Sequence, residues 1–97
     1  MGEGHAVWRL MRGDVLLGSI VVDEADFPWR YGRFTAEPEF EEVRPWFEAV
    51  LAVLEAEDYD RFDAVYASIA EELTFLAPAG PVTDFLLHIE GERAWFR

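Results

Sequence analysis

One stretch sets the layout of this chain: Phe27-Pro28-Trp29-Arg30-Tyr31-Gly32-Arg33-Phe34. Before it the residues alternate as in a β-hairpin, and after it the apolar residues recur at helical spacing. Pro28 keeps Phe27 out of a helix, and Gly32 allows a sharp turn or a bulge. The sequence therefore predicts an irregular loop here, followed by a short edge strand over Arg33-Phe34-Thr35.

The residues before this stretch predict two antiparallel strands. Residues 6–11 and 16–22 are rich in Val, Ile, Leu and Trp, and Gly13-Asp14 between them suits a two-residue type II′ turn. Charge in Asp23-Glu24-Ala25-Asp26 is expected to end the second strand. Apolar residues occupy both faces of this hairpin, so we expect helices on one face and the Trp29 loop or a partner subunit on the other.

Two helices follow, joined by a short connection that predicts an antiparallel helical hairpin. The first is amphipathic from Pro38 onward, with glutamates on the side away from the apolar stripe. Pro45 leaves two alternatives open. Either the helix kinks there, or a short turn over 38–43 leads into a helix whose first turn holds Pro45. The second helix carries apolar residues at steps of three and four from Tyr59 to Leu73.

The C-terminal third reads as strands. We predict one over 74–77, a Pro-Gly turn, and then a hairpin of 82–90 and 93–97 around Gly91-Glu92. In that register His88 faces Trp95. The whole chain is expected to be one α+β domain, residues 1–97. Its order is β-β-(β)-α-α-β-β-β, with a mostly antiparallel sheet and the helical hairpin on one face.

The amino-acid composition excludes several classes of function. The 97 residues include no cysteine, which excludes disulfides, thiolate zinc sites and cysteine nucleophiles. The formal net charge is −12. Such a field repels nucleic-acid backbones and anionic membranes and favours basic partners, so no direct nucleic-acid or membrane binding is expected. There is no long apolar run and no signal-like N-terminus, which predicts a cytoplasmic protein.

No catalytic, nucleotide-binding or zincin motif occurs, so we predict no catalytic residue, no metal and no cofactor. The acidic clusters do not match an EF-hand and are interpreted as solvated helix ends. One group of residues still suits a catalytic or metal-binding site. His88, with Asp84 and Glu90 on the same strand face, suits an acid/base or metal site, although cross-strand pairing explains the same residues.

The aromatic and arginine residues of the central stretch have two interpretations. Trp, Tyr and Arg are typical of interface hot spots, whereas a small domain also needs large side chains to close its core. We assign Phe27 and Phe34 to the core. The predicted binding residues are Trp29, Arg30, Tyr31, Arg33, His88 and Trp95.

Several segments together resemble a family of short bacterial proteins that has no assigned function. They are Asp26-Phe27-Pro28-Trp29, Tyr31-Gly32-x-Phe34, Phe40, Arg44-Pro45-x-Phe47, Phe85-Leu86-Leu87-His88-Ile89 and Ala94-Trp95-Phe96. The resemblance spans most of the chain. It implies a free-standing bacterial domain and brings no activity, ligand or catalytic residue.

These observations favour a non-enzymatic protein-interaction module that binds a basic protein, as immunity proteins and inhibitors of basic toxins do, or that mimics nucleic acid. The alternative is a small-molecule binding protein or hydrolytic enzyme that uses His88, Asp84 and Glu90. A homodimer is a third, structural alternative, because apolar residues lie on both faces of the first hairpin.

Overall fold

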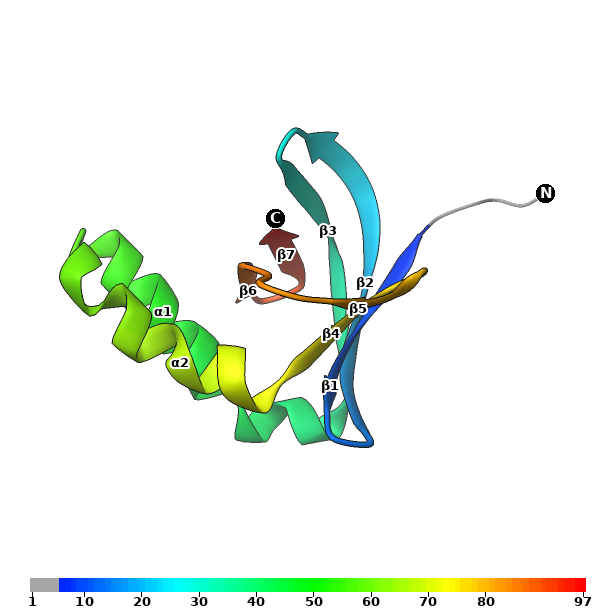
Figure 1. Cartoon of the computed structure of the whole chain (residues 1–97), viewed down its shortest axis with the longest axis horizontal. Coiled ribbons are helices and arrows are strands. Elements are labelled where there is room, and N and C mark those ends of the chain that lie inside the picture. Colours follow the sequence, from blue (N-terminus) through cyan, green and yellow to red (C-terminus); the bar gives the residue numbers. More distant parts are fainter. Residues whose placement is uncertain (1–5) are drawn as a thin grey trace.

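The computed structural model describes residues 6–97 and has the predicted α+β class. Seven antiparallel strands form one curled sheet in the order β5-β4-β1-β2-β3-β7-β6, with two helices beside it (Figure 1). The strands are β1 Val7–Arg12, β2 Val15–Asp26, β3 Trp29–Ala36, β4 Thr74–Ala77, β5 Gly80–Val82, β6 Leu87–Glu90 and β7 Arg93–Phe96. The helices are α1 Arg44–Glu55 and α2 Phe62–Glu72, with 3-10 turns η1 Pro38–Glu42 and η2 Tyr59–Arg61. Among residues 6–97, no helix has the length and apolarity needed to cross a membrane.

The prediction of a loop after residue 22 was wrong. β2 continues through its charged end to Asp26, and Phe27-Pro28 turns the chain directly into β3 (Figure 1). The charges are tolerated because the side chains of Asp23, Glu24 and Asp26 face solvent. Their backbone groups are satisfied by pairing with β3, where Asp26 faces Trp29.

β3 is a central strand, not the predicted edge strand, because it pairs with β2 on one side and β7 on the other. Gly32 makes no sharp turn, but the pairing of β2 with β3 shifts by one residue beside it, between Val22 and Glu24, so the irregularity lies on the partner strand. Gly32 faces Val22 in β2 and Ala94 in β7. A side chain there would meet Ile20 Cγ2 at 2.8 Å and run into the Val21 carbonyl group, so glycine permits the close approach of β2.

The region around Pro45 follows the second of the two alternatives. η1 ends at Glu42, and α1 begins at Arg44 with Pro45 in its first turn. Proline is tolerated there because the first helical N–H groups have no partner within the helix. α1 and α2 then lie side by side (Figure 1).

The core lies between the inner face of the sheet and the helices. Phe34 is 2% exposed and packs edge-on against Phe40 of η1, with ring centroids 4.8 Å apart. Phe75 and Phe96 make a similar pair at 4.9 Å. The assignment of Phe34 to the core is confirmed. The same assignment was wrong for Phe27, which is 96% exposed at the β2–β3 turn.

The strand expected over 82–90 is divided in two. β5 pairs with β4, and β6 pairs with β7, at opposite ends of the sheet order. One straight strand cannot pair at both ends. The chain therefore leaves the sheet near Asp84, whose φ is 55°, and crosses to the other edge.

Tyr66 of α2 satisfies backbone groups where β6 begins. Its hydroxyl accepts a hydrogen bond from the Leu87 N–H at 2.8 Å and donates one to the Phe85 carbonyl at 3.2 Å. Burial raises the pKa of Tyr66 to about 12, although the Leu87 N–H partly opposes this by favouring the phenolate. The hydroxyl is therefore protonated at neutral pH, as donation to Phe85 requires.

We expect Tyr66→Phe to lower the free energy of unfolding by about 1–3 kcal/mol, because the buried Leu87 N–H loses its acceptor. Chemical denaturation at neutral pH measures this. Tyr59→Phe is the matched control, since Tyr59 is 64% exposed and should tolerate the same change. Equal stability of the two variants would contradict the role given to Tyr66.

Candidate functional site

Strand pairing brings most of the predicted binding residues onto one face of the sheet. Tyr31 of β3 faces Trp95 of β7, and Trp95 faces His88 of β6, so the three form a row across the strands. Directly opposite residues project from the same side of a sheet. Arg33 and Trp29 flank Tyr31 at spacings of two and therefore share this side. We call the side opposite the core the outer face.

Arg30 is the exception among the predicted binding residues. It projects from the other side of β3, where its guanidinium carbon lies 5.6 Å from the ring centroid of Trp8. Trp8 in turn packs against the core rings of Phe75 and Phe96 at 5.2 and 4.6 Å. Grouping Arg30 with Trp29 and Tyr31 was therefore wrong, because alternation along a strand separates neighbours.

His88 lies under the outer face and is not on its surface. Only 4% of the residue is exposed. The rings of Trp29, Trp95 and Phe62 surround it, with centroids 6.0, 5.6 and 6.4 Å from the imidazole. The sequence placed His88 on a polar strand face. It could not show that α2 would bring Phe62 over this end of β6.

The imidazole is held neutral by these surroundings. Burial lowers the pKa of His88, and the nearby positive charge of Arg97 lowers it further. The buried Nδ1 has no hydrogen-bond partner among the described residues. A proton added here would be poorly solvated, so His88 acts as a packing residue beneath Trp29.

The residues of the alternative acid/base site, His88, Asp84 and Glu90, do not form a common site. Asp84 and Glu90 are exposed while His88 is enclosed by aromatic rings. Within residues 6–97, no three histidine or carboxylate side chains lie close enough to hold one metal ion. An outside substrate would have to displace Trp29 or Phe62 to reach the imidazole.

Trp29, Tyr31 and Trp95 on the outer face and Phe27 in the adjoining turn, next to Trp29, are together called the outer aromatic surface. The first three are half-buried, whereas Phe27 is 96% exposed at the turn. Arg97 covers part of Trp29, with its guanidinium carbon 5.1 Å from the ring centroid. Reasoning from the sequence missed the exposure of Phe27. The signal available was the Asp-Phe-Pro-Trp tetrad itself, which places Phe27 beyond both strands if read as a two-residue turn.

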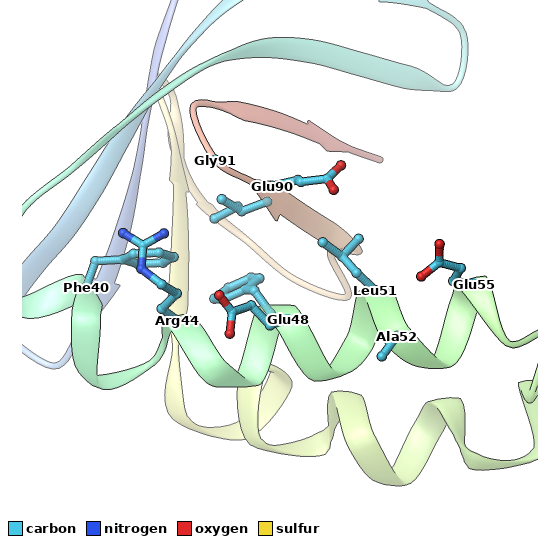
Figure 2. Close-up of a pocket in the computed structure, with 10 residues that line it drawn as sticks. Phe40, Arg44, Glu48, Leu51, Ala52, Glu55, Glu90 and Gly91 are labelled. Atoms are coloured by element: carbon cyan, nitrogen blue, oxygen red, sulfur yellow. The ribbon is translucent and has the colours of Figure 1, made fainter.

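A separate groove lies between α1 and the turn that joins β6 to β7 (Figure 2). Its volume is about 300 Å³. Phe47 and Ile89 are buried at its floor, and Glu48, Glu55 and Glu90 line it. Sequence reasoning placed Glu48 and Glu55 on a solvated helix side, because nothing local indicates that the Gly91-Glu92 turn, much later in the chain, approaches α1.

The enclosed imidazole predicts a stability that falls at acid pH. The pKa of His88 is lower in the folded chain than its usual 6.5, so the unfolded chain binds more protons below that pH. The free energy of unfolding should therefore fall as pH decreases from about 6.5 through the lower folded pKa. His88→Gln should remove this part of the pH dependence. Denaturation midpoints between pH 7.5 and 5 test it, and identical slopes for both proteins would contradict it.

No protein-family model, no curated protein and no solved structure matches this chain. The resemblance to short bacterial proteins therefore stays a prediction.

Proposed function

We propose that this protein is a non-enzymatic interaction module that binds another protein through the outer aromatic surface. The observation that supports it most is the 96% exposure of Phe27 beside Trp29. A large apolar side chain left in water contributes nothing to the fold, and removing it from water on binding is favourable.

The neighbouring residues have the composition of a binding hot spot. Trp, Tyr and Arg dominate such sites, and Trp29, Tyr31, Trp95 and Arg97 provide them on a pleated, rigid support. The row from Tyr31 to His88 fixes the rings through strand pairing. A partner would therefore meet a preorganised surface and pay little ordering entropy.

Charge favours a basic partner. Arg12, Arg33, Arg44, Arg61 and Arg93 each pair with a carboxylate of the chain itself. The chain has 20 carboxylate residues and 8 arginines, so the excess charge stays negative. Such a field accelerates encounter with a basic protein and weakens with added salt.

This combination suits an inhibitor or immunity-type protein of a basic toxin or nuclease in a bacterial cytoplasm. A second copy of the chain is the other partner that the outer aromatic surface could accept. The burial of His88 beneath Trp29 gives no support to the hydrolytic alternative.

We expect Phe27→Ala and the double change Trp29→Ala/Tyr31→Ala to abolish capture of a discrete, salt-sensitive partner from lysate of the native host. Phe27→Ala removes an exposed ring and should leave the fold intact, whereas Trp29→Ala also uncovers His88. Affinity capture at low salt, with circular dichroism of every variant, measures this.

Tyr59→Ala is the control, since it removes an aromatic ring that is 64% exposed and belongs to η2, not to the outer aromatic surface. Retention of the same partner by the folded Phe27→Ala protein and by the folded double variant would refute the proposal. Sedimentation of the purified protein shows whether the partner is a second copy.

A further inference from the structure

The groove beside α1 combines an apolar floor with an acidic rim. Figure 2 shows α1 forming one wall, with the end of β6 and Gly91 across from it. Phe47 and Ile89 are 1% and 3% exposed at its base. Leu51 and Ala52 of α1 continue this apolar lining toward the solvent. The floor suits an aliphatic side chain, and the volume of about 300 Å³ admits side chains but not a folded element.

The carboxylates of the rim are arranged around that floor. Glu48 and Glu55 are seven residues apart on α1, which places them two turns or about 10.5 Å apart on one side of the helix. Leu51 and Ala52 lie between them. Glu90, at the end of β6, also lines the groove, but its side chain projects from the same side of the strand as His88 and away from the floor at Ile89. A ligand in the groove therefore meets negative charge, then apolar surface, then negative charge.

Within residues 6–97, Glu48, Glu55 and Glu90 form no ion pair. Arg44 is the cation that lines the groove, and it is already engaged. Its Nη2 lies 2.6 Å from Glu41, and its guanidinium carbon lies 5.0 Å from the ring centroid of Phe40. Glu48 is near enough to help raise the pKa of Arg44, but Glu41 is the larger cause.

We propose that this groove binds a segment of a basic protein in which two arginine or lysine side chains flank an apolar one. The cations would pair with Glu48 and Glu55, and the apolar side chain would cover Leu51 above Phe47. We choose a basic ligand because of charge complementarity. The chain has no lysine, and Arg44, the cation that lines the groove, is already paired with Glu41. In an extended segment, residues i, i+2 and i+4 share a side and span about 13 Å, which flexible cationic side chains can match to the glutamates.

This site shares no residue with the outer aromatic surface, and so its test is independent. The probe is a synthetic peptide, acetyl-Arg-Ser-Leu-Ser-Arg-amide, titrated into the isotopically labelled protein at low salt. We expect amide chemical shifts to change for residues 47–55 and 89–91, and the dissociation constant to rise with salt. The analogues Arg-Ser-Ser-Ser-Arg and Glu-Ser-Leu-Ser-Glu should bind much more weakly.

Two variants that lose the same charge distinguish the effect of the groove carboxylates on peptide affinity from the effect of the net charge of the protein. Glu48→Gln/Glu55→Gln should weaken peptide binding about fivefold, because exposed ion pairs each change affinity by a small factor. Glu39→Gln/Glu71→Gln removes the same charge from exposed positions outside the groove and should change affinity less than twofold. The proposal would be overturned if both variants weakened peptide binding equally. It would also be overturned if the amide chemical-shift changes were centred outside residues 47–55 and 89–91.

The contribution of the apolar side chain of the peptide is tested separately. Binding of Arg-Ser-Ser-Ser-Arg as tight as that of the leucine peptide would show attraction to charge alone and would overturn the proposed recognition. The Trp29→Ala/Tyr31→Ala protein, if folded, should bind the peptide normally. Loss of the groove interaction therefore leaves the proposed function of the outer aromatic surface standing, and the reverse also holds.

Discussion

The pairing of β3 between β2 and β7 is the constraint on which the rest of the structure depends. It requires glycine at position 32, where a side chain would strike Ile20 and the backbone of Val21. Once β3 is central, strict alternation divides its residues between the two faces. Phe34 then enters the core against Phe40, while Trp29 and Tyr31 project outward. One strand thus supplies both Phe34 to the core and two of the candidate binding residues, Trp29 and Tyr31.

Much of the fold was predictable because its signals are local. Helical spacing, the strand over 74–77 and the pairing of His88 with Trp95 follow from short-range pattern and turn chemistry, whereas the pattern around Pro45 left two alternatives open. The errors were of another kind. Charge was taken to end β2, yet solvent at the exposed end of the strand accommodates charge readily. Strand continuity there depends on pairing with β3, which the Asp-Phe-Pro-Trp tetrad indicates only when Phe27-Pro28 is interpreted as a two-residue turn.

The candidate site was predictable in composition and less so in geometry. Trp29, Tyr31, Arg33, His88 and Trp95 do converge on one face, but Arg30 does not, because neighbouring strand residues point oppositely. The enclosure of His88 depends on Phe62, which arrives from α2. The groove depends on the approach of the Gly91 turn to α1. Both are tertiary contacts between segments that are far apart in the sequence, and a single sequence carries no signal for them.

β6 supports both surfaces, and alternation explains how four residues can do so. His88 projects outward beneath Trp29, whereas Ile89 projects inward and forms part of the groove floor. Tyr66 holds the start of the same strand through the Leu87 N–H. In the proposed functions the two surfaces have different physical tasks. Negative charge at the groove would act over a Debye length of roughly 8–10 Å and would direct the approach of a basic partner. The aromatic rings act only on contact, where burial of Phe27 and Trp29 would supply most of the affinity.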